Sequence, residues 1–474
     1  MDRPDGPPGP TSGALAAAFA RLSEHALGHA ARGPEAPAFR RAPEGALARL
    51  GAVPQQGRPL EEALEDLLDP ALSSGMDTGH RRFFAFIPSP ASPLSWLGDL
   101  AASVHNRHGG SELQSPGGAA LERGLIRLLC EAAGLPDAAG GLFVSGGSAA
   151  NLAGLCLARD QRLGEDERGR AVVYLTRETH ASVVKALRIL GFHDRQIRIV
   201  PTDGRLRMDV GALEAAIAAD RAAGRKPFAA AASAGTTNTG AIDPLAEIAD
   251  ICEAHGLWLH VDGAFGASAL LSGAHRGLLA GIERADSLSW DAHKWLFQTY
   301  GCGMLLVADR LALPQSFALS PDYLRDGAAE DVEPNFWDLG PELTRPDRAA
   351  RLWLTLQVMG RSGMAAAIAH GFALAEAAER AVRAADGWTV VSSAQMAIVA
   401  FRYAPEGLGE EDADAINAAA ARKLMEQGFA VVGTTRLGGR TCLRICAIHP
   451  QACEDDMTAT IARLDALARE LAGR

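Results

Sequence analysis

The chain has 474 residues, of which 48% are hydrophobic and 22% are charged, and its formal net charge is −11 at pH 7. This composition is typical of a soluble globular protein of two to three domains, and the acidic balance argues against a general affinity for nucleic acids or anionic membranes. Seven cysteines lie scattered along the chain, as is typical of free thiols in a reducing compartment. We therefore expect a cytoplasmic protein.

The N-terminal segment begins with MDRPDGPPGPTSG, whose proline and glycine content predicts disorder. The apolar stretch that follows, ALAAAFA, is too short for a membrane-spanning helix and has no basic segment before it. Ala- and Leu-rich periodic stretches predict helices across residues 14–72. We expect residues 1–75 to form an N-terminal helical segment.

From about residue 141 onward, short apolar runs alternate with helical stretches. The runs occupy residues 141–146, 171–176, 196–201, 227–235, 257–262 and 287–290. Such alternation predicts an α/β fold with a mostly parallel central sheet covered on both faces. A seventh run, 301–309, follows after only a short connection, so we expect that strand to be antiparallel. Residues 76–345 would form this large domain.

The end of the large domain and the remainder of the chain have a different pattern. Residues 315–345 are rich in Pro, Asp, Glu and Gly and predict a long mobile loop. The chain then becomes helical and gives strand candidates at 395–403, 429–433 and 441–448. We expect a smaller α+β domain over residues 346–474.

Several chemically useful residues follow the predicted strands directly. In open α/β sheets a ligand binds beyond the carboxyl ends of the strands, and there the sequence places Ser145-Gly146-Gly147-Ser148, His180, Gly235-Thr236-Thr237, Asp262 and His293-Lys294. The glycines open a helix, whose free N–H groups can bind a phosphate, although a tight strand-to-helix turn uses the same residue types. A single histidine at a strand end is more often structural than catalytic.

Pyridoxal phosphate is one small molecule that requires all of these groups. Its aldehyde binds a lysine covalently, and its ring nitrogen stays protonated beside a buried carboxylate. Its phosphate suits a helix N-terminus, and its flat ring suits an imidazole. A lysine is otherwise costly to bury, so this cofactor explains why Lys294 stands inside the stretch SLSWDAHKWLFQ.

The same residues belong to longer motifs that run in order along the chain. These are HRRFFAFIPSP (80–90), VSGGSAANL (144–152), THASVVKAL (179–187), AGTTNTGAIDPL (234–245), LWLHVDGAFGAS (257–268), DSLSWDAHKWL (286–296) and LTRPDRAARLW (343–353). In them the chain resembles the group II pyridoxal-phosphate decarboxylases, the family of aromatic-L-amino-acid, histidine and glutamate decarboxylases. The resemblance covers roughly residues 75–450. It implies PLP fold type I, which is aspartate-aminotransferase-like, and a homodimer with active sites at the interface.

The resemblance also implies a reaction and a set of site residues. The reaction would be decarboxylation of an L-amino acid, with an aromatic one favoured, to the amine and CO2. Lys294 would bind the cofactor covalently, Asp262 would pair with the ring nitrogen and His180 would stack on the ring, and these three would be catalytic. Further cofactor contacts would come from Gly147, Ser148, Thr237, Ala264, Asp291 and His293. Asp291 is the least expected of them, because an acid near a phosphate needs its own partner.

The first departure from the family pattern concerns proton delivery. Many relatives place a tyrosine on a loop where this chain has Phe336, or Trp337 if the gap is placed differently. Neither side chain can donate a proton, so His180, water or Tyr323 would have to supply it. A phenylalanine at this position accompanies aldehyde synthesis in some relatives, which makes an aldehyde synthase an alternative, and an aminotransferase is another.

The second departure concerns the substrate pocket. The segment 108–112 lacks the aromatic residues of aromatic-specific relatives and contains Gly110 and Glu112. If Glu112 lines the pocket, substrates with cationic or hydroxylated side chains should be favoured, so a decarboxylase of an acidic or diamino acid is a further alternative. Phe83, Phe84, Phe86 and Trp96 would form either an apolar pocket wall or a core patch.

Three hypotheses from other classes remain open at this point. Ser148 in GGSAA half-resembles the nucleophile elbow of a serine hydrolase, with His449 as its base, although the last glycine of that motif is missing. His260, Asp262 and His293 could instead bind a metal, because residues two apart on a strand share a face. A decarboxylase-like scaffold could also bind a ligand without turnover.

Overall fold

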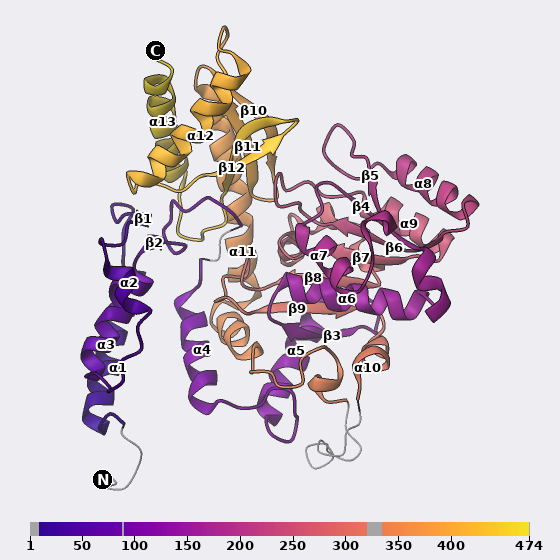
Figure 1. The fold of residues 1–474 in the computed structure, drawn as a ribbon, viewed down its shortest axis with the longest axis horizontal. Helices are drawn as coiled ribbons and strands as arrows, with labels where there is room; N and C mark the ends of the chain where they lie inside the picture. The colour runs from indigo at the N-terminus through magenta and orange to yellow at the C-terminus, as the bar shows by residue number, and fades with distance from the viewer. Residues whose placement is uncertain (1–8, 88–89, 320–333, 474) are drawn as a thin grey trace.

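A seven-stranded sheet forms the centre of the computed structural model, which describes residues 9–87, 90–319 and 334–473 (Figure 1). Its strands are β3 (Gly140–Val144), β4 (Ala171–Thr176), β5 (Ile197–Val200), β6 (Lys226–Ser233), β7 (Trp258–Asp262), β8 (Ser287–Asp291) and β9 (Gly303–Val307). They lie in the order β3-β9-β8-β7-β6-β4-β5. Strands β4 to β8 pair in parallel, and β9 is antiparallel to both of its neighbours, as predicted.

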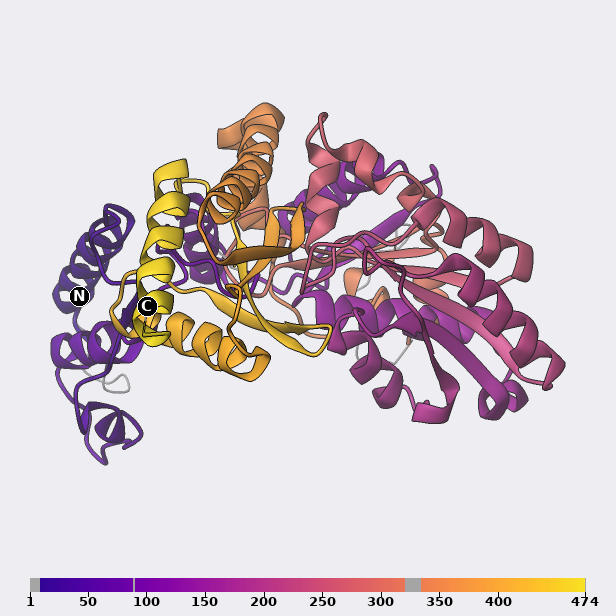
Figure 2. The same cartoon turned by 90° about the horizontal axis from the view of Figure 1, so that it is seen from above.

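Helices cover both faces of this sheet, because successive side chains of each buried strand point to opposite sides. Val172 and Tyr174 on β4 belong to the core shared with α5 (Pro116–Ala133), α8 (Val210–Ala222) and α9 (Leu245–His255). Val173 and Leu175 belong to the core shared with α6 (Gly147–Arg162), α7 (Ala181–Ile189) and α10 (Ala312–Phe317). Figure 2 shows the helices on the two sides of the sheet. Short 3-10 helices lie between these elements at Glu165–Arg170, Asp194–Gln196, Gly266–Leu271, Arg276–Leu279 and Ile282–Arg284.

The N-terminal part is helical, as predicted. It contains α1 (Ser12–Ala30), α2 (Ala46–Leu50), α3 (Leu60–Asp66) and a π-helix at Leu67–Leu72, followed by α4 (Pro93–His105). The short strands β1 (Phe39–Arg40) and β2 (Gly75–Met76), which pair with each other, were not predicted. Helix α1 lies at one side of the molecule (Figure 1) and buries none of its residues.

The C-terminal part packs helices against a second, antiparallel sheet. After α11 (Ala349–Ala384) come β10 (Trp388–Gln395), β11 (Ile398–Tyr403), α12 (Glu410–Glu426), β12 (Gly433–Leu437), β13 (Arg440–Cys446) and α13 (Glu454–Leu471). The sheet order is β10-β11-β13-β12. The predicted strand at 429–433 is wrong, because the strand begins at Gly433 and Val431 instead forms an isolated bridge with Phe83. The fold is thus α/β with a smaller α+β part, as expected, and the exact domain division at residues 75 and 345 stays a prediction.

The predicted loop at 315–345 contains regular structure in its described parts. Helix α10 extends to Phe317, and a 3-10 helix spans Phe336–Asp338. At the loop's end the Arg345 guanidinium forms a buried ion pair with Glu122 on α5, at 2.8 Å. Tyr323 lies outside the described residues. None of the helices in the described ranges has the length and apolar character needed to cross a membrane.

Candidate active site

Nearly all of the predicted site residues lie around one cavity at the carboxyl edge of the large sheet. Its volume is about 410 Å³, and we call it the lysine cavity; its lining includes Gly147, Ser148, His180, Asp262, Ala264, Asp291, His293 and Lys294. Thr237 instead lines an adjoining outer cavity of about 550 Å³, which shares His180 and Lys294 with the first. The residues meet because parallel strands end at the same edge of the sheet.

Lys294 lies in the turn after β8 with its side chain largely enclosed. Its Nζ is 3.1 Å from Oδ2 of Asp291, the last residue of β8. Asp291 is buried, and its other oxygen, Oδ1, has no hydrogen-bond partner among the described residues. The carboxylate that seemed out of place beside a phosphate therefore has a partner, the lysine ammonium.

Asp262, the last residue of β7, is a buried carboxylate held by neutral donors. It accepts hydrogen bonds from Asn151 Nδ2 (3.0 Å), the Ala264 N–H (3.1 Å) and Ser289 Oγ (3.3 Å). Within the described ranges no lysine, arginine or histidine forms an ion pair with it. A buried charge without a counter-charge is costly, so this carboxylate suits a ligand that brings a cationic N–H into the cavity.

The first turn of α6 forms part of the wall of the lysine cavity. The first N–H groups of a helix have no partners within it and favour an anion. A Cβ atom on Gly147 would lie 2.9 Å from Asp291 Oδ2 and 3.0 Å from the Ala264 Cβ, so only glycine leaves this turn open. This wall can hold a phosphate group through its backbone.

Two histidines and Arg444 complete the surroundings of the lysine. His180 caps α7, with Nδ1 2.7 Å from Ser182 Oγ. His293 contacts the Cys302 carbonyl at 3.1 Å through Nδ1, and burial lowers its pKa. Arg444, on β13, lines the outer cavity and donates to the Thr237 carbonyl, and none of the described acidic residues pairs with it. Sequence reasoning missed Arg444; an arginine within the apolar run 441–448 was its signal.

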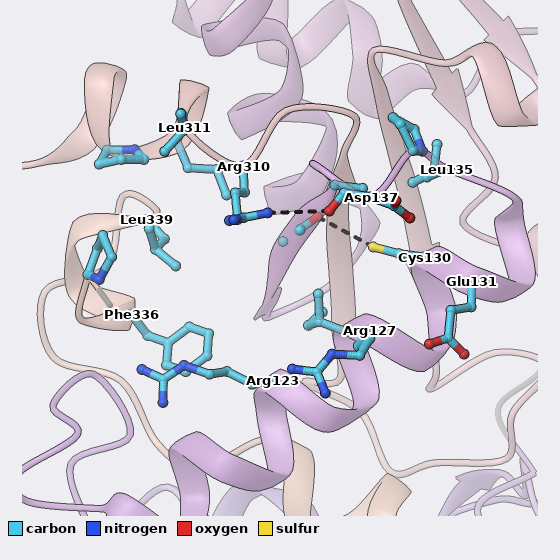
Figure 3. Close-up of a pocket in the computed structure, with 18 residues that line it drawn as sticks. Arg123, Arg127, Cys130, Glu131, Leu135, Asp137, Arg310, Leu311, Phe336 and Leu339 are labelled. Atoms are coloured by element: carbon cyan, nitrogen blue, oxygen red, sulfur yellow. Dashed lines mark hydrogen bonds between the residues drawn. The ribbon is translucent and has the colours of Figure 1, made fainter. Parts of the chain in front are cut away.

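Within a single chain, two residues expected on the substrate side lie away from Lys294. Phe336 is buried against a different cavity, of about 430 Å³, near Arg123 (Figure 3), and the guanidinium of Arg345 also lies over its ring. Glu112 pairs with Arg123, which lowers its pKa, and it is absent from the described lining of the lysine and outer cavities. Within one chain, neither residue faces Lys294.

The apolar wall expected from four aromatic residues is only partly present. Phe86 lines the outer cavity, whereas Phe83 and Phe84 are buried in the hydrophobic core. Trp96 lies on α4, with its ring 6.0 Å from that of His29. Phe86 is therefore the one of these four found in the described lining of the outer cavity.

The geometry removes the hydrolase and metal hypotheses. His449 donates through Nε2 to the Gly79 carbonyl, 2.9 Å away, and lies outside the described lining of the lysine cavity that holds Ser148. His260 uses both ring nitrogens, with Nδ1 2.8 Å from Ser287 Oγ and Nε2 3.0 Å from Asn151 Oδ1. The described residues contain no cluster of His, Cys, Asp or Glu side chains suited to a metal ion.

The buried position of His449 predicts acid sensitivity. Burial lowers its pKa to about 4, from an ordinary value of about 6.5, so the unfolded chain binds this proton first as the pH falls. Stability is then lost between about pH 6.5 and 4, and at pH 5 the loss from this group is about 2 kcal/mol. Urea unfolding at pH 7.5 and pH 5 should show a smaller loss on acidification for His449→Gln than for the wild type. Equal losses would contradict the assignment.

Comparisons with known proteins agree with the chemistry of the cavity. The pyridoxal-dependent decarboxylase conserved domain matches residues 45–404. An aromatic-L-amino-acid decarboxylase of Bacillus atrophaeus is 40% identical over 422 residues, covering 89% of this chain and 88% of the relative. An L-2,4-diaminobutyrate decarboxylase of Rhizobium meliloti is 34% identical over 429 residues, covering 90% and 86%.

A solved structure gives the same result for the fold. The crystal structure of Oryza sativa TDC with PLP and tryptamine superposes with a TM-score of 0.92 at 28% identity, covering 99% of each chain. The lysine, the uncompensated Asp262 carboxylate and the open α6 turn fit pyridoxal phosphate. Together, the site and these relatives show that the chain belongs to the pyridoxal-dependent decarboxylase family and is a PLP-dependent amino acid decarboxylase of fold type I.

Proposed function

We propose that the protein decarboxylates an aromatic L-amino acid to the corresponding amine. The observation that carries this proposal is the convergence of Lys294, Asp262 and Arg444 on two joined cavities whose outer part has apolar walls. Phe86, Ile87 and Val432 supply apolar surface there, and no aspartate or glutamate is found among the described lining residues of the outer cavity.

Each residue would have a distinct role in this reaction. When bound, pyridoxal phosphate supplies an electron sink for the electron pair that remains after CO2 departs. Lys294 would hold the cofactor covalently, and Asp262 would keep its ring nitrogen protonated. His180 would stack on the ring and return a proton to carbon, since an imidazole can act as a general acid.

The remaining predicted residues would position the cofactor. Gly147 and Ser148 would hold the phosphate through the first turn of α6, with His293, Asp291 and Thr237 nearby, and Ala264 would touch the ring face opposite His180. Support comes from their places in the two cavities. Asp291 would also hold the Lys294 ammonium before the cofactor binds, given the 3.1 Å contact.

The choice of an aromatic substrate is supported by the outer cavity and by a relative. A distal ammonium group, as in diaminobutyrate, would need a carboxylate partner, and the described lining offers Arg422 and Arg444 instead. The 40% identical relative from Bacillus atrophaeus is described as an aromatic-L-amino-acid decarboxylase. Glu112, paired with Arg123, is then a poor candidate for a substrate contact.

The deciding experiment measures CO2 release from a panel of L-amino acids by the PLP-loaded protein, together with product analysis. We expect tryptophan, tyrosine or phenylalanine to give the highest kcat/KM and the amine as product. Preference for diaminobutyrate or glutamate would overturn the substrate assignment. Aldehyde, ammonia and peroxide, formed with consumption of O2, would indicate an aldehyde synthase.

Replacing Arg444 tests whether the outer cavity binds the substrate. We propose that its guanidinium, which is buried and lacks a carboxylate partner among the described residues, binds the carboxylate of the amino acid. A charged hydrogen bond contributes about 1.5–3 kcal/mol, so Arg444→Gln should raise KM by about 10–100-fold with normal cofactor binding. Arg422→Gln, on the same cavity, is the matched control, and equal effects of the two changes would contradict the specific role.

Replacing Gly147 tests whether α6 holds the phosphate. A Cβ atom at this position would fill the open turn between Asp291 and Ala264, so Gly147→Ala should weaken cofactor binding by at least about tenfold, equivalent to about 1.4 kcal/mol. Gly124→Ala is the matched control, because a Cβ atom at Gly124 on α5 meets nothing within 4 Å. Cofactor titration of the two purified variants makes the comparison, and equal affinities would contradict this phosphate position.

We further propose that the protein is a cytoplasmic homodimer. Support for a second copy comes from large apolar side chains exposed on α1 and α4, namely Leu15, Phe19, Leu27, Leu97 and Val104. Such apolar surface is typical of a protein interface. The seven cysteines are free thiols, which suits a reducing compartment. Sedimentation analysis should give twice the mass of the chain, and a monomer would contradict the proposal.

A further inference from the structure

A series of hydrogen bonds, buried as far as Ser182, connects the core of the large sheet to His180. It starts at the Trp258 indole, which donates to Ser287 Oγ at 2.7 Å. It continues from Ser287 through His260 and Asn151 to Ser182 and then His180, with contacts of 2.8, 3.0, 2.9 and 2.7 Å. Asp262 joins this chain at Asn151, whose Nδ2 lies 3.0 Å from its Oδ2.

Asp262 determines which way the Asn151 amide points. An ionised carboxylate can only accept hydrogen bonds, so Asn151 must turn its NH2 group toward Asp262 and Ser182. Its carbonyl oxygen, Oδ1, then faces His260 Nε2, which must carry the proton.

The hydrogen bonds at the Trp258 end require the same donors and acceptors. An indole N–H can only donate, so Ser287 Oγ accepts from Trp258 and uses its own hydrogen to donate to His260 Nδ1. Burial lowers the pKa of His260 and keeps it neutral, with one proton, on Nε2. Every donor in this part of the chain thus has an acceptor.

The same reasoning assigns the donors and acceptors between Asn151 and His180. The second amide hydrogen of Asn151 points to Ser182 Oγ, which leaves the serine hydroxyl free to donate to His180 Nδ1. The Ser182 backbone N–H also donates to this nitrogen, at 3.3 Å. Since Nδ1 accepts from both, the proton of a neutral His180 resides on Nε2, the nitrogen left for the cavities that His180 lines.

We propose that Asn151 is a positioning residue through which the charge of Asp262 turns the Ser182 hydroxyl toward His180 Nδ1. Together with the Ser182 backbone N–H, that hydroxyl holds His180 in the tautomer that presents an Nε2–H donor to the ligand. This inference rests on the proposed function for the identity of the ligand. The ligand would be an amino acid whose carboxylate accepts the hydrogen bond from His180 Nε2. The bond between Asp262 and Asn151 thereby couples the cofactor's ring nitrogen to the side chain that would contact the substrate.

The direct test is the tautomer of His180 in ¹⁵N-histidine-labelled protein. Solid-state ¹⁵N NMR distinguishes protonated from unprotonated ring nitrogens, and the difference from His180→Gln identifies the signals. We expect the wild type, with and without pyridoxal phosphate, to carry the proton on Nε2. A wild-type His180 protonated on Nδ1 would overturn the proposal, whatever the variants do.

Two variants test the role of Asn151. Asn151→Asp replaces the donor toward Ser182 by an acceptor, so the serine hydroxyl should turn toward it. Nδ1 of His180 then loses the shorter of its two donors, and its signal should shift. Ser182→Ala removes the link and should shift the Nδ1 signal if Asn151→Asp does not fold. Ser268→Ala is the matched control, because its buried hydroxyl accepts from Trp290 at 3.1 Å outside the chain of hydrogen bonds. An unchanged His180 spectrum in both test variants would overturn the proposal.

A kinetic measurement separates this inference from the proposed function. In PLP-loaded Asn151→Asp, loss of the donor should raise KM for the best substrate by about tenfold or more, and cofactor binding should persist. The tautomer measurement needs no turnover. If the His180 Nδ1 signal responds as expected and no amino acid is decarboxylated, the proposed function fails while the role of Asn151 stands.

Discussion

Replacing Lys294 with alanine is expected to abolish covalent attachment of the cofactor and to lower turnover by about 10³-fold or more, since positioned nucleophilic and proton-transfer groups each contribute about 10²–10⁴-fold. The structure gives the reason for the size of this effect. Lys294 lies between the lysine cavity and the outer cavity and contacts Asp291, so it can reach both cofactor and substrate. The variant should still bind the cofactor non-covalently through α6 and Asp262.

The measurement is borohydride reduction of the PLP-loaded protein followed by peptide mass spectrometry. The wild type should carry the reduced cofactor on residue 294, and Lys294→Ala should carry none. Lys185→Ala, which removes an exposed lysine from α7, is the matched control and should label and turn over normally. A label on another lysine, or near-normal turnover of Lys294→Ala, would contradict the assignment.

Much of this site could be predicted because it depends on simple rules of strand direction. Asp262, Asp291 and the turn before Gly147 all stand at the carboxyl ends of strands that run in the same direction. Residues at these ends must meet, however far apart they lie in the sequence. The apolar runs and the short connection before β9 were sufficient to infer the strand directions, but not the order of the strands in the sheet.

The substrate side could not be predicted in the same way, because it depends on tertiary packing. Arg444 reaches the outer cavity from β13, whose place against the large sheet no local pattern specifies. Phe336 matches a loop tyrosine in sequence, yet the guanidinium groups of Arg123 and Arg345 lie over its ring and it is buried. From the sequence, Glu112 could line the substrate pocket, but in the structure it forms an ion pair with Arg123.

The role of Asn151 could not be predicted from the sequence, although the residue lies within one of the motifs. It stands within the motif VSGGSAANL, and an asparagine inside a helix carries no signal of its own. Only the distances to Asp262, Ser182 and His260 show that its amide connects three other groups. Hydrogen-bond direction follows from such contacts and cannot be inferred from residue spacing.

Replacing Asp262 with alanine is expected to reduce turnover by about 10²–10³-fold, the usual effect of removing one preorganised electrostatic group. Cofactor affinity should fall less, by about 10–100-fold, because a charged hydrogen bond contributes about 1.5–3 kcal/mol and the lysine and helix contacts remain. The larger effect on turnover follows because a protonated ring nitrogen matters most when the electron pair enters the ring. Cofactor titration and saturating-substrate kinetics on the same preparations give both numbers.

Asp262→Asn separates the charge from the hydrogen bonds. The amide oxygen can still accept from Asn151, but the residue no longer offers a negative charge to the ring nitrogen, so turnover should fall nearly as far as in Asp262→Ala. Asp286→Asn is the matched control. Asp286 stands just before β8, at the other edge of the sheet, where burial raises its pKa and its carboxylate accepts from the Leu259 N–H. Normal turnover of Asp262→Asn would show that hydrogen bonding suffices and that the uncompensated charge at the end of β7 has no catalytic role.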